Sequence, residues 1–329
     1  MDWQLQKVLV TGAGGFIGSH LTERLVRLGA QVRAFVHYNS RNDWGLLELL
    51  PEDVLAQIEI FPGDLTDAAC VRQAVAGCQT VFHLGALIAI PYSYQAPRQF
   101  IDTNVVGTLN VMQACRDEHV QKVVHTSTSE TYGTARYAPI DEGHPLQGQS
   151  PYAASKIAAD MVAESFYRSF ELPVATLRPF NTFGPRQSAR AVIPTIISQA
   201  LVCDTVKLGL LTPVRDLTFV ADTVSAFIKI AESDQSIGQV FNAGTGRGVT
   251  IGKVAKMIIK MCDDNKAIVA DTERFRPPKS EVMALISDST KAREILGWEP
   301  QYSLEQGLEH TVAYMRNHLH RYKPDVFNR

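Results

Sequence analysis

The first half of the chain alternates short apolar runs with longer segments of helical spacing. The apolar runs, rich in valine, isoleucine and phenylalanine, cover residues 7–11, 32–36, 58–61, 80–84, 122–126 and 174–177. Between them, apolar residues recur at helical intervals over residues 16–28, 68–76, 100–118 and 152–170. Short buried strands that alternate with amphipathic helices are typical of a parallel sheet covered on both faces. We therefore predict an α/β fold with a Rossmann-like, doubly wound parallel sheet.

The alternation loosens after about residue 180. Prolines interrupt it at positions 179, 185, 194 and 213, and Pro277-Pro278 predicts an extended loop. Helices are still expected over residues 192–202, 221–231, 251–261 and 304–319. We predict a larger domain over residues 1–180 and a smaller, loop-rich C-terminal lobe over residues 181–329, with some segments of the lobe returning to the main sheet.

Composition argues against several classes of function. The 329 residues are 45% hydrophobic and 20% charged, and the net charge of −2 favours neither nucleic acid nor an anionic membrane as a partner. The five cysteines are scattered without a Cys-x-x-Cys pair, so we predict neither a metal site nor a disulfide framework. The longest apolar stretch, near residues 81–90, is too short to span a bilayer, and no signal segment precedes the first strand. We expect a cytoplasmic protein.

A glycine-rich turn joins the first predicted strand to the first predicted helix. Its sequence is Gly12-Ala13-Gly14-Gly15-Phe16-Ile17-Gly18. Glycines at positions 12, 15 and 18 permit a tight turn, close approach of the backbone to a diphosphate, and tight packing of helix on strand. The helix N-terminus adds N–H donors for the phosphates. We predict that this segment binds a dinucleotide through Gly12, Gly15, Phe16, Ile17 and Gly18.

The end of the second predicted strand lacks the acidic residue that usually binds the adenosine ribose. Val36 is followed by His37-Tyr38-Asn39-Ser40-Arg41. Arg33 and Arg41 could meet a 2′-phosphate, which favours NADP, or both could be solvated surface residues. Asp64-Leu65 could contact adenine or form an ordinary loop. We assign His37, Asn39, Ser40, Arg41, Asp64 and Leu65 to the cofactor site.

Two segments carry the acid–base chemistry. Tyr152 and Lys156 lie four residues apart, on one face of the helix predicted over residues 152–170. A lysine ammonium beside a phenol favours the phenolate, so we expect Tyr152 to take a proton from an alcohol near neutral pH while the cofactor takes the hydride. Glu130 adds a second acid–base group, which suggests an elimination or a proton abstraction beside the new carbonyl.

Each of these residues also has a structural interpretation. A tyrosine and a lysine at this spacing occur by chance in many helices, and Glu130 could form a surface ion pair or cap a helix. We interpret Tyr132 as a packing residue, His125 as a buried core histidine, and His83 as a loop residue near the cofactor rather than a base.

Together these motifs resemble the extended short-chain dehydrogenase/reductase superfamily, in the branch of nucleotide-sugar epimerases and dehydratases. The resemblance covers nearly the whole chain, through the glycine turn, Tyr152/Lys156 and the segments Phe82-His83-Leu84-Gly85-Ala86, Asn104, Arg178-Pro179-Phe180-Asn181, Arg215-Asp216 and Arg276-Pro277. Thr128-Ser129-Glu130 resembles the Thr-Asp/Ser-Glu triplet of 4,6-dehydratases, where epimerases usually carry no carboxylate. The central serine is similar to GDP-mannose 4,6-dehydratases and differs from the aspartate of dTDP-glucose 4,6-dehydratases.

Two further runs resemble configuration-retaining UDP-N-acetylglucosamine 4,6-dehydratases of the legionaminic-acid type, which serve pathways to bacterial cell-surface sugars. The runs are Tyr38-Asn39-Ser40 with Asp43-Trp44-Gly45, and Pro145-Leu146-Gln147-Gly148-Gln149-Ser150-Pro151-Tyr152. This resemblance implies a tightly bound, internally recycled NAD, with NADP left open by the arginines, and places Leu84 and Ala86 at the cofactor. It also implies a homodimer formed through residues 100–118 and 152–170.

The resemblance implies the following reaction. Tyr152, polarised by Lys156, takes the C4 hydroxyl proton as hydride leaves C4, and Thr128 hydrogen-bonds the C4 oxygen. Glu130 removes the C5 proton, water leaves from C6, and hydride returns to C6 to give a 4-keto-6-deoxy sugar. The C6 hydroxyl is protonated either by Glu130 in turn or by Ser129 through a water, and the sequence leaves both open.

Asn181, Arg215 and Arg276 are the expected contacts to the nucleotide and diphosphate of the substrate, because an arginine fork gives paired hydrogen bonds to phosphate. Alternatively, Arg215 forms a structural pair with Asp216. Two rival functions also stay open. One is a UDP-sugar C4-epimerase, which would use the tyrosine, the lysine and NAD without Glu130, and the other is a non-catalytic NAD(P)-binding protein.

Overall fold

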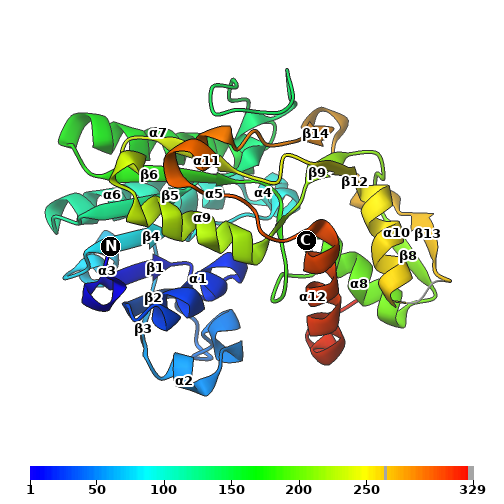
Figure 1. The fold of residues 1–329 in the computed structure, drawn as a ribbon, viewed down its shortest axis with the longest axis horizontal. Coiled ribbons are helices and arrows are strands. Elements are labelled where there is room, and N and C mark those ends of the chain that lie inside the picture. The colour runs from blue at the N-terminus through cyan, green and yellow to red at the C-terminus, as the bar shows by residue number, and fades with distance from the viewer. Residues whose placement is uncertain (263–264, 325–329) are drawn as a thin grey trace.

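A seven-stranded sheet forms the centre of the molecule (Figure 1). The computed structural model describes residues 1–262 and 265–324. The strands are β1 (Lys7–Thr11), β2 (Gln31–His37), β3 (Ile58–Gly63), β4 (Thr80–His83), β5 (Lys122–Thr126), β6 (Val174–Pro179) and β11 (Val240–Ala243). They lie in the order β11-β6-β5-β4-β1-β2-β3, and all neighbours are parallel. This confirms the predicted α/β, Rossmann-like, doubly wound sheet.

Helices cover both faces of the sheet (Figure 1). One face carries α3 (Ala68–Val75), α6 (Gly107–Asp117) and α7 (Pro151–Phe170), and the other carries α1 (Phe16–Arg27) and α9 (Val220–Glu232). Each face buries its own apolar cluster, represented by Val81 and Val111 on the first and by Val10 and Phe227 on the second. Burial on both sides explains why the strands read as continuous apolar runs.

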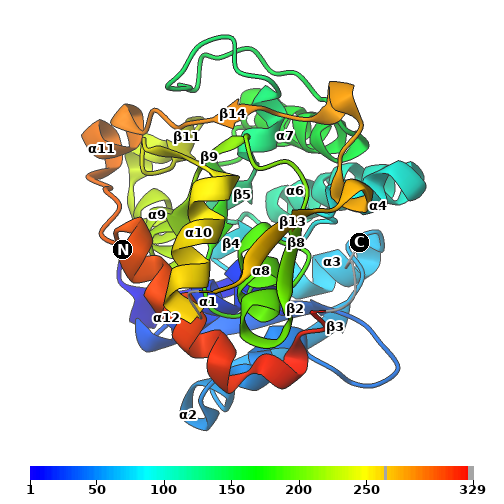
Figure 2. The same ribbon diagram turned by 90° about the vertical axis from the view of Figure 1, so that its right-hand side faces the viewer.

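The C-terminal part packs against the α1/α9 side (Figure 2). Its helices are α8 (Val192–Val202), α10 (Ile251–Cys262) and α12 (Leu304–Asn317). A two-stranded sheet pairs β13 (Ala267–Ala270) with β8 (Thr205–Leu208), and a three-stranded sheet has the order β12 (Gly248–Thr250), β9 (Val214–Asp216), β14 (Ala284–Leu285). The apolar cluster of this part continues into the α1/α9 face, so the two parts share a core.

The remaining elements are short. They comprise β7 (Thr182–Phe183) paired with β10 (Thr218–Phe219), the helices α2 (Glu52–Leu55), α4 (Ile90–Gln95), α5 (Pro97–Phe100) and α11 (Thr290–Leu296), and the 3₁₀ segments η1 (Trp3–Leu5), η2 (Gly45–Leu49), η4 (Ser129–Tyr132), η5 (Asp234–Ser236), η6 (Thr272–Arg274), η7 (Pro278–Ser280) and η8 (Leu319–Arg321). Within residues 1–262 and 265–324, no helix has the length and apolarity needed to cross a membrane.

The helix predicted over residues 100–118 is composite. A π-helical segment, η3 (Ile101–Val106), separates α5 from α6. Asn104 within it is buried; its Oδ1 accepts from the backbone N–H of Leu87 (2.8 Å), and its Nδ2 donates to Ser155 Oγ (2.9 Å). The segment therefore ties the loop after β4 to α7, a role typical of π-turns near functional sites.

Candidate active site

The carboxyl ends of four neighbouring strands carry the expected functional segments. The glycine turn follows β1, Leu84 and Ala86 follow β4, residues 128–130 follow β5, and Asn181 follows β6. Because β6, β5, β4 and β1 are adjacent and parallel, their following loops meet at one edge of the sheet. This is the edge at which open α/β sheets bind ligands.

The glycine turn has no room for side chains where it crosses the loop after β4. Gly12 has a φ of +70°, and a Cβ on it would lie 2.8 Å from the Cα of Gly85. A Cβ on Gly18 would overlap the carbonyl of Gly12. The helix α1 begins at Phe16, and its N-cap, Gly15, makes no side-chain cap. The N–H groups of its first turn therefore suit a diphosphate, and the residues present fit a dinucleotide.

The loop after β2 folds back over the glycine turn, which the sequence analysis did not anticipate. The backbone N–H of Leu46 donates to the carbonyl of Gly14 (2.9 Å), and a Cβ on Gly14 would lie 2.7 Å from the carbonyl oxygen of Trp44. This explains Gly14, the one glycine of the turn that the dinucleotide pattern does not require.

The residues expected at the adenosine ribose lie in this loop. Asn39 shapes it, since its Nδ2 donates to the carbonyl of Asp43 (2.8 Å) and its Oδ1 accepts from the N–H of Arg41 (3.1 Å). His37 and Ser40 are exposed, and Arg41 extends into solvent with Asp43 3.6 Å from its guanidinium. The loop therefore presents polar groups that are free to meet a ribose.

Arg33 differs from both of its expected roles. It is buried, and its Nε donates to Glu59 (2.8 Å) while its Nη1 donates to the carbonyl of Ala74 (2.7 Å). It is neither a solvated surface residue nor a ligand for a 2′-phosphate. Of the two arginines that favoured NADP, only Arg41 is still available to meet a 2′-phosphate.

Asp64 and Leu65 lie beside the loop after β4. The N–H and the hydroxyl of Thr66 both donate to Asp64 Oδ1 (2.8 Å each), and these bonds hold the pKa of Asp64 below its usual value although partial burial opposes ionisation. A Cβ on Gly85 would lie 2.7 Å from Leu65 Cδ1, so the leucine covers the residue between Leu84 and Ala86. These predicted cofactor residues are thus close together.

His83 is not a loop residue as we expected. It is the last residue of β4 and is buried, and its Nδ1 lies 2.8 Å from Thr11 Oγ1. Thr11 Oγ1 accepts from the N–H groups of Leu84 and Gly85, so its own proton goes to His83. Burial, with further contributions from nearby His125 and Lys156, places the pKa of His83 well below its ordinary value, and it serves as a neutral spacer between strand and loop.

Tyr152 and Lys156 both lie on the buried face of α7. Ser150 caps this helix by accepting from the N–H of Ala153 (3.1 Å). The Nζ of Lys156 donates to the carbonyl of Thr126 (2.7 Å), at the end of β5. Burial lowers the pKa of Lys156 to about 8, against the opposing pull of the Asp160 carboxylate.

The phenol of Tyr152 does not have the low pKa that the sequence analysis expected. Burial raises its pKa above the ordinary value, and the hydrogen bond with Thr128 only partly offsets this. The Glu130 carboxylate also lies close enough to raise it. Tyr152 is therefore protonated in the structure as it stands, and Thr128 is the group in contact with it.

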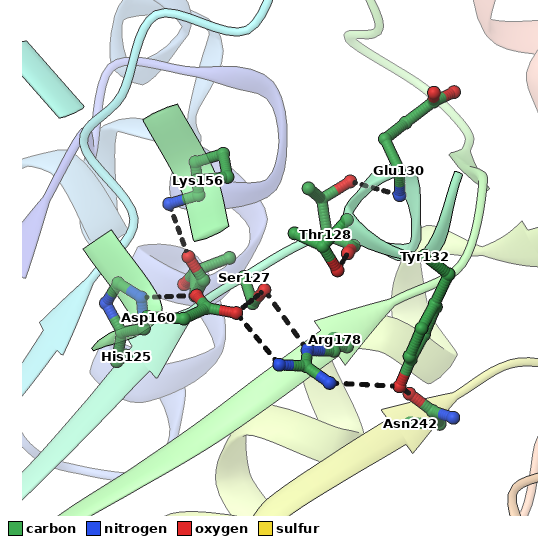
Figure 3. Close-up of polar contacts among 11 residues, drawn as sticks. His125, Ser127, Thr128, Glu130, Tyr132, Lys156, Asp160, Arg178 and Asn242 are labelled. Carbon is green, nitrogen blue, oxygen red and sulfur yellow. Dashed lines mark hydrogen bonds and ion pairs between the residues drawn. The ribbon is translucent and has the colours of Figure 1, made fainter. Parts of the chain in front are cut away.

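Glu130 occupies the space between the tyrosine and two arginines. Its backbone N–H donates to Thr128 Oγ1 (3.3 Å), while its carboxylate turns away from Tyr132 (Figure 3). Glu130 Oε1 lies 3.7 Å from Arg276 Nη1, and the carboxylate also favours the charged form of Arg215. Ser129, by contrast, is 2% exposed.

Arg215 does not form the pair with Asp216 that was the alternative to a role in substrate binding. Its Nη2 lies 3.4 Å from Glu281 Oε1, and burial lowers its pKa although the nearby Glu130 carboxylate opposes this. Asp216 instead accepts from backbone groups, including the N–H of Gly246 (2.8 Å) and of Ser287 (3.1 Å). The arginine is therefore not committed to Asp216, and that alternative interpretation is wrong.

Two of the expected substrate residues carry buried polar atoms without a hydrogen-bond partner. They are Asn181 Oδ1 and Arg276 Nη1. A buried polar atom left unpaired costs about 1–3 kcal/mol, so such atoms are informative where a ligand is expected. They suit a substrate that supplies a donor to the asparagine and an acceptor to the arginine.

A buried polar network below the site was missed by the sequence analysis (Figure 3). Asp160 accepts from His125 Nε2 (3.0 Å), Ser127 Oγ (2.6 Å) and Arg178 Nη2 (3.1 Å). Arg178 continues to Tyr132, whose hydroxyl donates to Asn242 on β11 (2.7 Å). Tyr132 is thus a polar link as well as a packing residue. The available signal was the position of Asp160, one helical turn after Lys156.

Among the residues described, no group of three or more histidine, cysteine, aspartate or glutamate side chains is arranged to hold a metal ion. None of the five cysteines, which all lie in the described part of the chain, forms a disulfide. The predicted site residues carry hydroxyl, carboxyl, amide, ammonium and guanidinium groups.

Comparison with known proteins identifies the family. A family model described as GDP-mannose 4,6 dehydratase matches residues 9–311. The chain belongs to this family. Its relatives include the UDP-glucose 4-epimerase of Mycolicibacterium smegmatis, which is 34% identical over 94% of this chain and 99% of the relative. They also include the dTDP-glucose 4,6-dehydratase of Xanthomonas campestris, 30% identical over 93% of this chain and 92% of the relative.

Solved structures agree with this assignment. DesIV, a dTDP-glucose 4,6-dehydratase from Streptomyces venezuelae solved with NAD, matches with a TM-score of 0.84 and 28% identity over 97% of this chain and 99% of its own. The family thus contains nucleotide-sugar dehydratases and epimerases, and this chain is an enzyme of that group. Membership does not by itself distinguish the two reactions.

Proposed function

We propose that this chain is a nucleotide-sugar 4,6-dehydratase that converts UDP-N-acetylglucosamine to the 4-keto-6-deoxy sugar. The observation that carries the proposal is the position of Glu130. Its carboxylate lies near enough to the Tyr152 phenol to affect its pKa, and 3.7 Å from Arg276 on the opposite side. A base placed between the group that binds the C4 hydroxyl and the group that binds the diphosphate is suited to the proton on C5.

Tyr152, Thr128 and Lys156 have separate roles in the first step, the oxidation at C4. Tyr152 first loses its own proton to water, and its phenolate then takes the C4 hydroxyl proton. Thr128, already in contact with the phenol, hydrogen-bonds the oxygen that becomes a carbonyl. Charged Lys156, held by Thr126, stabilises the phenolate that accepts this proton. NAD, held by the glycine turn, would supply the hydride acceptor for C4 and the hydride donor for C6.

Glu130 then removes the C5 proton, which the adjacent 4-keto group has made acidic. The same glutamic acid gives this proton to the C6 hydroxyl, so that water leaves, the C5–C6 double bond forms and the carboxylate is restored. Ser129 is buried at 2% exposure, which favours Glu130 over Ser129 for this second transfer. As hydride returns to C6, a proton from water adds to C5, and it replaces the proton that Tyr152 took from the C4 hydroxyl and releases to water.

The substrate lobe, residues 181–329, supplies the contacts to the nucleotide. Arg215 and Arg276 bind the diphosphate, and Asn181 binds the sugar or the nucleotide through its unpaired Oδ1. The choice of UDP and of an N-acetyl group rests on the resemblance of the loops at residues 38–45 and 145–152. NAD, as in the structure of DesIV, is favoured over NADP because Arg33 is committed to Glu59.

A homodimer is part of the proposal. Apolar side chains are exposed on η3, α6 and α7, the helices of the expected interface. They are Ile101, Val106, Leu109, Met161 and Phe170. Burial of such a surface in a second copy of the chain would remove it from water.

A C4-epimerase is the second candidate, favoured by the relative from Mycolicibacterium smegmatis. It would use Tyr152 and Lys156 in the same way, but it would not need Glu130 as a base because no proton leaves C5. The two functions give products of different mass, because only the dehydratase loses water.

The proposal is tested by incubating the purified protein, without added cofactor, with UDP-N-acetylglucosamine, UDP-glucose, GDP-mannose and dTDP-glucose. Loss of one water and a new C6 methyl signal, followed by mass spectrometry and NMR, is expected for UDP-N-acetylglucosamine. An isomer of unchanged mass would establish the epimerase. If every donor stays intact, with and without added NAD or NADP, the enzymatic proposal fails.

A further inference from the structure

The reaction described above does not involve the polar network centred on Asp160. Its members lie on several elements: His125 on β5, Arg178 on β6, Asn242 on β11 and Asp160 on α7. Ser127 follows β5 directly, and Tyr132 ends η4. The side chains of Asp160, His125 and Arg178 are exposed by only 4%, 0% and 5%. Burial of charged groups is costly unless they are paired, so such a network needs an explanation beyond stability.

Almost every buried polar atom of the network has a hydrogen-bond partner. The Asp160 carboxylate accepts three hydrogen bonds, and Arg178 donates to Asp160, Ser127 and Tyr132. His125 Nδ1 is the buried atom of the network that has no partner, so the ring is a neutral donor through Nε2. Although burial opposes ionisation, the hydrogen bond from His125 and the nearby cations hold the pKa of Asp160 below its usual value.

The negative charge of Asp160 lies one helical turn from Lys156, on the same face of α7. Lys156 does not touch it and is instead held by the carbonyl of Thr126 (2.7 Å). Figure 3 shows the lysine above the carboxylate. Ser127, which binds Asp160, directly precedes Thr128, so the same carboxylate holds the strand end that carries the hydroxyl beside Tyr152.

We propose that Asp160 is a positioning residue whose buried carboxylate keeps Lys156 charged and fixes Ser127, and with it Thr128, beneath the substrate's C4 oxygen. The role rests on the C4 oxidation within the proposed function. That step is common to dehydratases and epimerases, so the inference does not depend on which of the two reactions the enzyme completes.

The groups that face Lys156 agree with this role. They are Asp160 from its own helix, His83 from β4 and His125 from β5. Both histidines are buried, and both have a pKa below the ordinary value because of burial, so they contribute no counter-charge. Asp160 is therefore the anion that opposes the loss of the lysine's proton.

Asp160→Asn tests the proposal, with Asp222→Asn as the matched control. Asp222 is an equally inaccessible aspartate on α9 that accepts from the backbone N–H groups of Gln301 (2.8 Å) and Tyr302 (3.2 Å), far along the chain from the site. Both variants lose a buried carboxylate, and only Asp160→Asn removes the charge near Lys156. Purified protein labelled with [ε-¹³C]lysine is titrated by NMR, and the Lys156 signal is assigned by its absence in Lys156→Met.

The expected result is a lower pKa for Lys156 in Asp160→Asn, by about one pH unit or more, as is typical when a nearby opposite charge is removed. Asp222→Asn should leave that titration unchanged. In turnover assays, Asp160→Asn should move the alkaline limb of the pH profile to lower pH and reduce kcat at least 10-fold at pH 8, while KM changes less than threefold. Asp160→Glu, which keeps the charge, should recover part of the loss.

An unchanged Lys156 titration in folded Asp160→Asn overturns the proposal, and so does an equal shift in Asp222→Asn. Should Asp160→Asn not fold because Arg178 is left buried and unpaired, the double variant Asp160→Asn/Arg178→Met removes both charges and is expected to give the same downward shift. The NMR titration needs no substrate. A shifted lysine in a protein that acts on no nucleotide sugar would therefore overturn the proposed function and leave the electrostatic role intact.

Discussion

Glu130 and Arg276 form an ion pair across the site, with 3.7 Å between Oε1 and Nη1. The glutamate follows β5, and the arginine comes from the loop between η6 and η7, so the pair joins the carboxyl edge of the main sheet to the C-terminal part of the chain. Arg276 Nη1 has no hydrogen bond even so. A diphosphate can therefore compete with the carboxylate for the arginine, and a bound substrate would leave Glu130 free to accept a proton.

The first prediction concerns Glu130→Gln. The amide keeps the shape of the side chain and cannot take the C5 proton, so dehydration should fall by about 100-fold or more. C4 oxidation should continue, and reduced nicotinamide should accumulate on the enzyme, as followed by its near-ultraviolet absorbance. The matched control is Glu281→Gln, because both side chains are 12% exposed and each lies beside an arginine. The control should change KM at most, whereas an epimerase would tolerate both substitutions equally.

The second prediction concerns Arg276→Ala. Charge-assisted hydrogen bonds contribute about 1.5–3 kcal/mol each, so the loss of the guanidinium should weaken UDP binding roughly 10- to 100-fold. Isothermal titration with UDP measures this without any turnover. Arg276→Lys should recover only part of the affinity, because an ammonium lacks the planar fork. Arg293→Ala is the control, since this arginine on α11 is 56% exposed and pairs with Glu299. Equal affinity in wild type and Arg276→Ala would remove Arg276 from the substrate site.

The main sheet was predictable because its strands are buried on both faces. The bounds of β1 and β5 agree with the apolar runs at residues 7–11 and 122–126, and α8 agrees with residues 192–202. The short strands of the C-terminal part, from β7 to β14, were not predicted, apart from the expectation that some segments return to the main sheet. Strands of two to four residues have no measurable period, and their pairing depends on the loops that bring them together.

The site was predictable only where one local segment carries it. The glycine turn and the pair Tyr152/Lys156 each lie within a single helix or turn, and the structure places them at one edge of the sheet. Both interpretations of Arg33 and the alternative pair of Arg215 with Asp216 were wrong, because the partners of these arginines, Glu59 and Glu281, are distant in sequence. The depressed pKa expected for Tyr152 was wrong because burial outweighs the neighbouring groups.

The third prediction concerns Gly12→Ala in the glycine turn. It distinguishes the cost of a left-handed backbone from the cost of a side chain that collides with the neighbouring loop. Gly12 and Gly77 have similar dihedrals, with φ of +70° and +74°, but a Cβ on Gly77 would meet nothing within 4 Å. Gly77→Ala should therefore cost only the left-handed strain of about 1–2 kcal/mol. Gly12→Ala should cost more, because it pushes the backbone of Gly85 away from the turn, and should release the bound dinucleotide. Thermal unfolding and mass spectrometry of the ligand retained on purification measure both effects. Equal destabilisation, with the dinucleotide kept in both variants, would contradict the proposed cradle.

The fourth prediction is that Lys156→Met makes the protein more stable near neutral pH. Burial lowers the pKa of Lys156 from 10.5 to about 8, so the folded state opposes its charge. Below about pH 8 the lysine is charged in both the folded and the unfolded states, and the full cost of burying that charge is present. Its removal should therefore raise the free energy of unfolding at pH 7 by on the order of 1–3 kcal/mol, less the lost hydrogen bond to Thr126.

The sign of the pH dependence distinguishes this effect from better packing of a methionine. Between about pH 8 and pH 10.5 the folded protein loses the lysine's proton before the unfolded chain does, so the wild type gains stability relative to the variant as the pH rises. The advantage of Lys156→Met should accordingly shrink across this range, as measured by urea unfolding at several pH values. An advantage that does not depend on pH would show that packing is its source. A variant that is less stable at every pH would show that the hydrogen bond to Thr126 outweighs the cost of the buried charge.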